Sequence, residues 1–294
     1  MKVYFISKKN SERSSTTARL FEEACHTEGA DFVTVFAEGA SSLSLPSPEK
    51  GDAVLREATG SAARRVERSL LSPQVAHLYS SYERSLLSYP ASFVIHEKLG
   101  LPIIPTHYIN APVSRTAVRE IAGLLGFPLV LKIMGGMKGV GIIQVDSLEG
   151  LFSLTDYLCA EEKHFYIRKY VPHGYAVRAV VVGSRIAACY RVKVGTDEFR
   201  ANVATGEDER GKREVYHCAP ELERIILQSV QVMGYELGGV DILLGEDGNF
   251  YISEINFPCD LSIVKEVTGI DIPREIVRRL KEKGAAILAE ANET

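Results

Sequence analysis

The chain has 294 residues, 46% of them apolar and 24% charged, which is typical of a globular protein and is enough for two or three compact units. Its formal charge of −4 argues against a nucleic-acid or anionic-membrane partner acting along the whole chain. The five cysteines form no CxxC pair, and no run reaches the roughly 18 apolar residues of a membrane span or resembles a signal peptide. We therefore expect a reduced, cytoplasmic protein.

The first hundred residues begin as a βαβ unit. Apolar periodicity predicts three elements: a strand at Val3–Ile6, a helix at Thr17–Thr27 and a strand at Phe32–Phe36. A helix is predicted over Ala53–Leu71 and a further strand near Val75–Leu78. Two prolines within Leu101–Pro105 stiffen the backbone and remove hydrogen-bond donors, so this segment is the predicted end of the first unit.

A glycine cluster marks the second unit. A helix from Ser114 ends at Gly126, a strand follows and ends near Lys132, and the run GGMKGVG then leads into a strand at Ile142–Val145. This order places the glycines inside a β-hairpin, whereas Walker and Rossmann loops join a strand to a helix. Glycine lets backbone approach a ligand closely, and the preceding Lys132 favours a phosphate. A merely flexible turn is the alternative.

Three arginines fall near strand positions in the next part of the chain. Strands are predicted at Phe165–Tyr170, Ala176–Val182 and Ile186–Val192, and the arginines are Arg178, Arg191 and Arg200. Exposed arginines usually make surface pairs worth at most about 1 kcal/mol. Arginines that converge on a cleft bind phosphate or carboxylate through two parallel hydrogen bonds. Spacing leaves both interpretations open.

The stretch Gly238–Asn256 contains two β-prone runs around Glu246-Asp247-Gly248-Asn249. Asp-Gly between alternating apolar residues predicts a tight hairpin, and a turn centred on Asp247-Gly248 places Asp241 directly opposite Glu254. Facing carboxylates repel each other, so a cation is expected between them. Asn256 projects to the same face, because strand side chains alternate with period two. These three oxygen donors suit Mg²⁺, and a solvated polar face is the alternative.

Four segments taken in order resemble the ATP-grasp fold, specifically the RimK-like family of carboxylate–amine ligases. They are FPLVLKIMGGMKGVGII, YAVRAVVVGSRIAACYR, DEFRANVATG, and GGVDILLGEDGNFYISEIN followed by TGIDI. The resemblance covers about Leu101 to Leu280 and implies an α/β (α+β) chain. In that chain an N-terminal βαβ pre-ATP-grasp domain at 1–100 precedes a central ATP-grasp subdomain with the Gly-rich loop at 101–170 and a C-terminal subdomain with the magnesium site at 171–294.

The same resemblance implies a role for each matched position. The ATP phosphates and the loop that closes over them would involve Lys132, Gly136, Met137, Lys138, Gly139 and Gly141. The adenine side would be a hinge made of Arg168, Lys169, Tyr170 and Val171. The catalytic set on the substrate and phosphate side would be Arg178, Arg191, Arg200 and Asn202. The magnesium ligands would be Asp241, Glu254 and Asn256.

Two departures from the family pattern bear on the site. The family's first ATP-binding lysine has no counterpart near Tyr89-Pro90, where Arg84 and Lys98 are the possible substitutes. After Asn256, a loop that is usually small reads Phe257-Pro258-Cys259-Asp260, and we expect it to bear on the choice of substrate.

The implied reaction is ATP-dependent joining of a carboxylate to an amine through an acyl phosphate, with ADP and phosphate released. The cofactors would be ATP and Mg²⁺, as two ions, with Mn²⁺ as a substitute. Expected partners are a small carboxylate and an amine, or a peptide or carrier-protein terminus, in a homo-oligomer without nucleic acid or membrane. The alternatives are a non-catalytic ATP-binding regulatory module and an ATP-grasp kinase.

Overall fold

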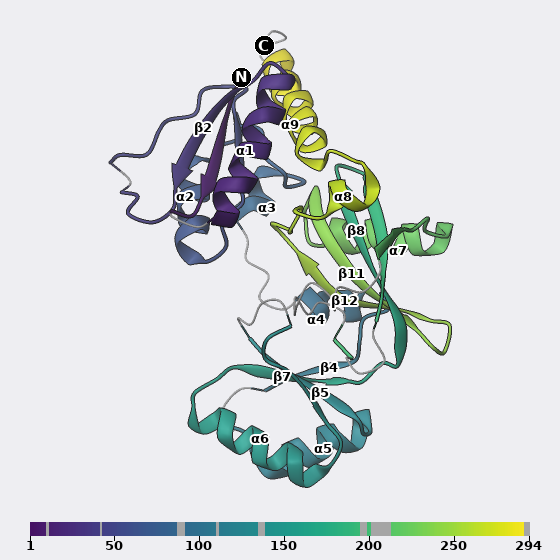
Figure 1. The fold of residues 1–294 in the computed structure, drawn as a ribbon. Coiled ribbons are helices and arrows are strands. Elements are labelled where there is room, and N and C mark those ends of the chain that lie inside the picture. Colours follow the sequence, from purple (N-terminus) through teal and green to yellow (C-terminus); the bar gives the residue numbers. More distant parts are fainter. Residues whose placement is uncertain are drawn as a thin grey trace.

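The computed structural model describes residues 1–9, 12–41, 43–86, 92–109, 112–134, 139–194, 199–200 and 213–290. Within these residues the strands form three sheets, with orders β2-β1-β3, β4-β7-β5-β6 and β10-β9-β8-β11-β12 (Figure 1). No helix in the described part of the chain is long and apolar enough to cross a membrane.

The N-terminal sheet is parallel and confirms the predicted βαβ beginning. Its elements are β1 (Lys2–Ser7), α1 (Glu12–Thr27), β2 (Asp31–Phe36), β3 (Ala53–Arg56) and α2 (Ser61–Leu70). The helix predicted over Ala53–Leu71 was wrong in its first part, because Ala53–Arg56 is a fully buried strand beside β1. The predicted strand near Val75–Leu78 is reduced to a single parallel bridge between Ala53 and Ala76.

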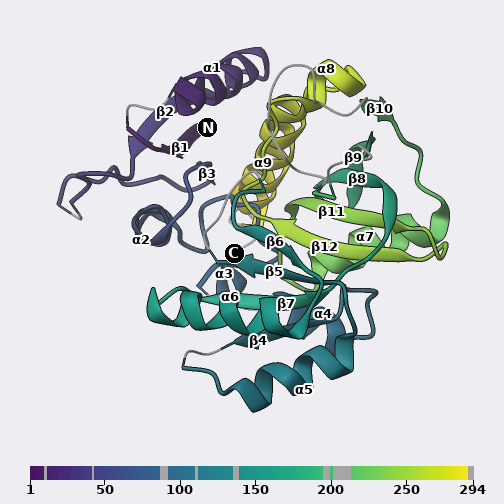
Figure 2. The same ribbon diagram turned by 60° about the horizontal axis from the view of Figure 1, so that its bottom comes forward.

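Short helices lead from the N-terminal sheet to the four-stranded antiparallel sheet. The elements are α3 (Tyr82–Leu86), α4 (Ser92–Lys98), β4 (Thr106–Ile109), α5 (Arg115–Leu125), β5 (Leu129–Ile133), β6 (Ile142–Val145), α6 (Leu148–Ala160) and β7 (Phe165–Lys169). The helix predicted from Ser114 to Gly126 is confirmed, and the Ser114 side chain caps α5 by accepting from the Ala117 amide. One face of the sheet packs on α5 and α6 through Leu131, Ile167 and their neighbours (Figure 2).

The five-stranded sheet is also antiparallel and is buried on both faces. Its strands are β8 (His173–Val182), β9 (Arg185–Lys193), β10 (Arg213–Val215), β11 (Leu237–Gly245) and β12 (Phe250–Asn256). Helix α7 (Pro220–Gln231) covers the face that carries Val177 and Val240. The opposite face, with Val180 and Val182, packs toward the N-terminal sheet and the C-terminal helices.

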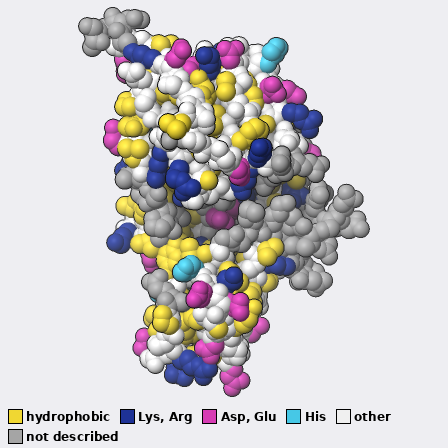
Figure 3. All heavy atoms as spheres, turned by 90° about the vertical axis from the view of Figure 1, so that its left-hand side faces the viewer, with side chains coloured by type: hydrophobic (Ala, Val, Ile, Leu, Met, Phe, Trp, Pro, Cys, Tyr) yellow, Lys and Arg dark blue, Asp and Glu magenta, His cyan; other side chains and the backbone are white. Residues whose placement is uncertain are grey.

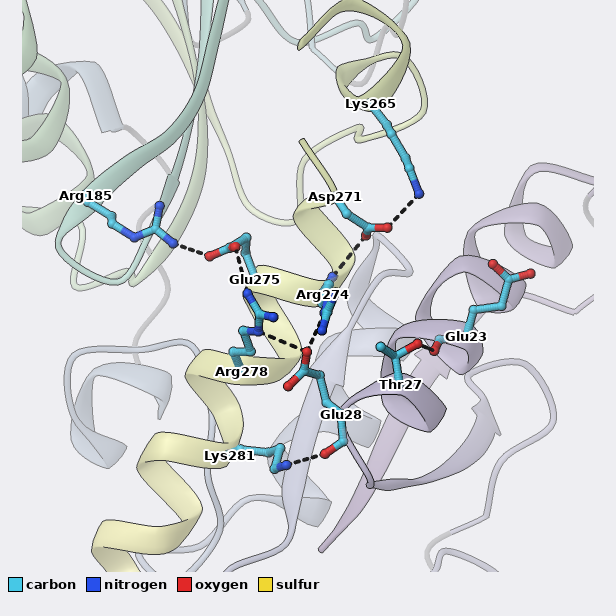
Figure 4. Close-up of polar contacts among 10 residues, drawn as sticks. All are labelled: Glu23, Thr27, Glu28, Arg185, Lys265, Asp271, Arg274, Glu275, Arg278 and Lys281. Carbon is cyan, nitrogen blue, oxygen red and sulfur yellow. Dashed lines mark hydrogen bonds and ion pairs between the residues drawn. The ribbon is translucent and has the colours of Figure 1, made fainter. Parts of the chain in front are cut away.

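The last two helices return the chain to its beginning. They are α8 (Val264–Thr268) and α9 (Ile272–Ala289). Helix α9 packs beside α1, where Glu28 accepts hydrogen bonds from Arg274 and, at 2.9 Å, from Arg278, while Lys281 donates to the Glu28 carbonyl (Figure 4). These contacts join α9 to the end of α1, and a core cluster that includes Phe5 of β1 and Ile276 of α9 continues the contact.

The four-stranded and five-stranded sheets meet at β12. Its Ile252 amide donates to the Pro102 carbonyl at 2.7 Å, and its carbonyl accepts from Ile104 at 3.3 Å, so the segment before β4 runs along the edge of β12. The chain crosses between the sheets at residues 170–172, which join β7 to β8. Figure 3 shows a recess at mid-height with an acidic side chain at its floor. The division at residues 100 and 170 stays a prediction.

Candidate active site

The β11–β12 hairpin carries two carboxylates that face each other. Asp241 pairs with Glu254 and Gly239 with Asn256, which confirms the predicted cross-strand pairing. Paired residues of neighbouring strands project to one side of the sheet, so Asp241, Glu254 and Asn256 share a face. Three oxygen-bearing side chains from two strands thus lie on one surface.

Two irregularities produce this pairing. The turn is longer than predicted: the Gly245 amide donates to the Asn249 carbonyl at 2.9 Å, leaving three loop residues, of which Gly248 has φ 80°. A regular ladder from this turn would place Ser253 opposite Asp241. The register shifts after Ile242, which pairs with Ile252, so Ser253 is an extra residue in a β-bulge. The bulge cancels the longer turn and restores Glu254 to its place.

Cations from two strands hold the carboxylates. Arg178, directly opposite Asp241 on β8, places its Nε 2.6 Å from a carboxylate oxygen, and the Asn256 amide donates to the other oxygen at 3.3 Å. Lys132, from β5 of the other sheet, places Nζ 3.0 Å from Glu254. We expected a metal ion to offset the repulsion between the two carboxylates, and in this structure Arg178 and Lys132 offset it.

Burial and charge act against each other at this site. Burial raises the pKa of Asp241 to about 6, the nearby Arg178 opposing the rise and Glu254 adding to it. For Lys132, burial alone would lower the pKa, but the facing Glu254 outweighs it and the pKa is raised. At neutral pH Asp241 therefore keeps its negative charge, with the charged Arg178 and Lys132 nearby.

Gly239 makes room for the Arg178 guanidinium. A Cβ on Gly239 would lie 2.7 Å from Nη1 of Arg178 and 2.6 Å from the Cβ of Cys259. Real Cβ atoms do not approach so closely, so a side chain at this position would displace Arg178 or the loop after Asn256. Gly239 is thus a packing requirement of the site.

The opposing face of the four-stranded sheet is cationic and aromatic. Lys132 pairs in register with Tyr166, and Arg168 lies two residues further along β7, so all three share the face away from α5 and α6. The Arg168 guanidinium lies 4.7 Å above the Tyr166 ring, and its Nη1 donates to the Ser253 carbonyl at 2.9 Å. Sequence reasoning placed Arg168 in a hinge but missed both contacts, and nothing in the spacing signalled the bulge carbonyl.

The remaining predicted hinge residues connect the two sheets. Lys169 ends β7, and its amide donates to the Pro105 carbonyl at 3.0 Å. Tyr170 lies in the crossing, with its ring centroid 6.3 Å from that of Phe199. Val171 is buried, and its carbonyl contacts Nδ1 of His173 at 2.7 Å. These residues therefore line the junction where the predicted adenine hinge would lie.

The glycine loop lies in a hairpin, as predicted, since β5 and β6 pair antiparallel. Gly139 and Gly141 have φ 78° and 82°, which strongly favours glycine, and the Gly141 carbonyl accepts from Ile133 at 2.8 Å. Arg200 donates to the Gly139 carbonyl at 3.2 Å, which brings these two predicted positions together. Four other predicted positions lie outside the described residues: Gly136, Met137, Lys138 and Asn202.

The structure does not bring Arg191 to this set. A regular ladder from the Gly183-Ser184 turn would put Arg191 on the same face as Arg178, but the β8–β9 register shifts between Val180 and Val181. Arg178 therefore faces Tyr190, and Arg191 turns to the other face. There its Nε lies 2.6 Å from Glu214 and its guanidinium 4.6 Å from the centre of the Tyr175 ring.

The two suggested substitutes for the first ATP lysine lie on α3 and at the end of α4. Arg84 packs against Gly234, where an added Cβ would lie 2.9 Å from its side chain, and Lys98 is exposed at the end of α4. Neither is placed beside Lys132 by a described contact.

The loop after Asn256 is anchored to the N-terminal sheet. The Phe257 ring stacks on Tyr235 at 4.8 Å between centroids and meets Tyr79 edge-on at 5.0 Å. The Arg56 guanidinium lies 5.1 Å from the same ring and forms a buried pair with Glu67 at 2.7 Å. The predicted substrate loop therefore starts where the β11–β12 hairpin meets the C-terminal end of β3.

The donor set fits a hard cation. Within the described ranges no three or more His, Cys, Asp or Glu side chains are grouped so that they could hold a metal ion by themselves, but Mg²⁺ is commonly held by one or two carboxylates together with substrate phosphates. Asp241, Glu254 and the Asn256 carboxamide match that pattern. The buried Nη1 of Arg178 and Nε of Arg168 have no hydrogen-bond partner among the described residues, and Arg178, beside Asp241, thereby keeps a donor for an anion.

Comparisons with known proteins agree with this architecture. The solved structure of the ligase PsnB with a minimal precursor, Mg and ADP superposes with a TM-score of 0.70 at 15% identity, over 96% of this chain and 98% of that one. That structure is described as an ATP-grasp ligase. Two antiparallel sheets that meet at a lysine and a pair of facing carboxylates, next to an N-terminal α/β unit, thus define an ATP-grasp fold.

The family follows from the sequence match. A probable alpha-L-glutamate ligase of Pseudomonas paraeruginosa is 27% identical over 193 residues, which are 65% of this chain and 61% of that protein. The ribosomal protein bS6–L-glutamate ligase of Shigella boydii is 25% identical over 181 residues, 61% of this chain and 58% of that protein. The chain thus spans about three fifths of the length of these relatives. Residues 95–280 match the RimK-like ATP-grasp domain, and the chain belongs to that family.

Proposed function

We propose that this protein is a cytoplasmic, ATP-dependent ligase that joins a carboxylate to an amine. One observation carries the proposal: Lys132 of the four-stranded sheet reaches Glu254 on the face that also holds Asp241 and Asn256. A side-chain cation that can bind phosphate, Lys132, thus lies across the junction of the two sheets from a set of side-chain oxygens that can bind a metal ion. A nucleoside triphosphate with Mg²⁺ would bind both groups, because the phosphate oxygens would accept hydrogen bonds from Lys132 and the carboxylates would coordinate the metal ion.

The nucleotide would lie between the two sheets. Lys132 would exchange Glu254 for phosphate oxygens, and the loop with Gly139 and Gly141 would cover them and exclude water. The crossing at Lys169–Val171 would hold the adenine. When bound by Asp241, Glu254 and Asn256, Mg²⁺ would offset the negative charge of the phosphates, and two ions or Mn²⁺ in their place suit the same donors.

The chemistry would proceed in two displacements. An oxygen of the substrate carboxylate attacks the γ-phosphorus and ADP leaves, which forms an acyl phosphate. The amine nitrogen then attacks the acyl carbon, phosphate leaves, and the nitrogen loses a proton as the amide forms. Arg178 lies beside Asp241 and Arg200 beside the glycine loop, where fixed guanidinium charges would stabilise the anionic transition states.

The relatives suggest classes of substrate. The Shigella boydii protein is named for joining L-glutamate to ribosomal protein bS6, and PsnB was solved with a precursor peptide. We propose an amino acid or small acid as one substrate and a small amine, peptide or carrier-protein terminus as the other, without nucleic acid or membrane. A homo-oligomer is part of the same proposal.

The proposal is tested by ADP release with panels of acids and amines, together with mass detection of the product. Glu254→Gln keeps the shape but removes a charge, and we expect it to lower kcat by at least about a hundredfold, because a metal ligand loses its negative charge. The matched control is Asp156→Asn, which changes a carboxylate of α6 that forms an exposed ion pair with Arg115 of α5, and it should leave the rate unchanged. ATP hydrolysis that is independent of both substrates, or a stable phosphorylated product in place of an amide, would contradict the proposal.

A further inference from the structure

Three consecutive residues of β12 are each held by a different element of the four-stranded side. Ile252 bonds through its backbone to Pro102 and Ile104. The carbonyl of Ser253 accepts from Arg168 at 2.9 Å, and the carboxylate of Glu254 pairs with Lys132 at 3.0 Å. The edge of β12 is thus fixed to the neighbouring sheet residue by residue at the point where its register shifts.

Arg168 is built into this position. The residue is 7% exposed, its guanidinium stacks on Tyr166, and it lies on the inner strand β7, where it pairs in register with Thr106 and Val130. A guanidinium presents donors in a rigid plane, so a stacked arginine loses less freedom than a lysine when it bonds a fixed carbonyl. The Arg168–Ser253 bond is therefore a preorganised contact between the two sheets.

The bonded carbonyl belongs to the one residue that the ladder skips. Without the bulge at Ser253, the three-residue turn would place Ser253 opposite Asp241 and turn Glu254 to the far face of the sheet. A bulge disrupts the local ladder, so a hydrogen bond from outside the hairpin stabilises it. Arg168 supplies that bond, and the position of Glu254 depends on it.

The contact gains importance when the site is loaded. In the proposed function, Lys132 turns to phosphate and Glu254 to a metal, so the ion pair that now joins β5 to β12 opens. The Ser253 carbonyl has neither role, and its bond to Arg168 persists. We propose that Arg168 is a positioning residue that fixes the Ser253 bulge and keeps Glu254 opposite Asp241 after Lys132 has moved to the nucleotide. This inference rests on the proposed function of the site.

Amide hydrogen exchange of the nucleotide-free protein tests the mechanical part. In Arg168→Met the ion pair between Lys132 and Glu254 still holds β12, and in Lys132→Met the hydrogen bond from Arg168 to Ser253 still holds it. Each single variant should therefore raise amide exchange in peptides covering 250–256 only modestly. The double variant removes both contacts, and exchange there should rise by about tenfold or more, beyond the product of the single effects. A double variant that shows only that product would overturn the proposal.

Metal binding tests the positioning part. With a non-hydrolysable ATP analogue, Arg168→Met should weaken Mn²⁺ binding about tenfold, as expected for losing a charge-assisted hydrogen bond, while affinity for the analogue without metal stays within about twofold. Arg168→Lys should restore part of the loss, and it replaces the methionine variant if that one melts early. The control is Arg119→Met, since Arg119 also stacks on an aromatic ring, that of Phe152 at 5.3 Å, but on α5.

Two results would refute the inference. Equal loss of analogue affinity with and without Mn²⁺ would make Arg168 a direct nucleotide contact, and wild-type Mn²⁺ affinity in Arg168→Met would remove it from the site. Neither measurement requires amide formation. A wild-type protein that binds nucleotide and metal but ligates nothing would therefore contradict the proposed function and leave the role of Arg168 standing.

Discussion

Replacing Arg178 by methionine should destabilise the protein in a pH-dependent way. The guanidinium lies 2.6 Å from Asp241, and the two side chains are only 17% and 9% exposed. Methionine fills much of the same space but leaves the Asp241 carboxylate buried without its cation. Removing one partner of a buried ion pair costs about 3–5 kcal/mol, and we expect a loss of that size in the free energy of unfolding at pH 8.

The loss should shrink in acid. The folded pKa of Asp241, about 6, lies above its ordinary value because of burial, and Arg178 opposes that rise, so the variant raises it further. A carboxyl with a raised folded pKa holds its proton more tightly when folded, and its stability contribution is lost as pH rises through that pKa. The cost of the variant therefore falls by about 1.4 kcal/mol for each pH unit over which the variant alone holds the proton.

Urea denaturation at pH 8 and pH 5 measures the stability lost by Arg178→Met at pH 8 and the decrease of that loss in acid. A double variant, Arg178→Met with Asp241→Asn, leaves no charge of this pair buried and should recover most of the stability lost at pH 8. A loss that is equal at the two pH values, or a double variant no more stable than Arg178→Met, would show that packing and not charge governs this pair.

Other contacts lead to further predictions. Burial and Lys283 lower the pKa of His77 to about 4, so the stability that neutral His77 gives the fold is fully present above pH 6.5 and is lost as pH falls. His77→Phe should therefore make the free energy of unfolding about 2–3 kcal/mol less sensitive to a change from pH 6.5 to 4.5, as measured by denaturation. Gly239→Ala should cost about 1–3 kcal/mol, and Cys259→Gly in the same chain should restore part of the melting temperature. The sulfurs of Cys189 and Cys218 lie 3.4 Å apart, so diamide should link them with a mass loss of about 2 Da, and Cys218→Ser should prevent it.

The hairpin shows how far sequence reasoning reaches. Alternation and the Asp-Gly turn predicted that Asp241 lies opposite Glu254, and the structure confirms that pairing, but only because two irregularities that the sequence did not reveal cancel each other. The turn itself has one residue more than predicted, and the bulge at Ser253 compensates. The bulge depends on a donor from another sheet, Arg168, and no local pattern in β12 encodes that distant contact.

Tertiary pairing explains two other differences. The four residues Ala53–Arg56 show no alternation of apolar and polar side chains, so they were predicted as the start of the following helix. In the structure they form a strand beside β1 that is buried on both faces. Arg191 would share the face of Arg178 in a regular hairpin and is turned away by a shift in the β8–β9 register. A one-residue shift of this kind inverts every side chain beyond it, so faces can be assigned from sequence only as far as the first bulge.

The same arithmetic couples the turn of the β11–β12 hairpin to its bulge. If the turn tightened to Asp247-Gly248, so that Glu246 paired with Asn249, and the bulge at Ser253 stayed, β12 would slide by one residue and Ile255 would lie opposite Asp241 in place of Glu254. Straightening the bulge as well would bring Glu254 back. A change of turn at the exposed tip therefore keeps Asp241 opposite Glu254 only when the bulge changes with it, although the two sites lie several residues apart.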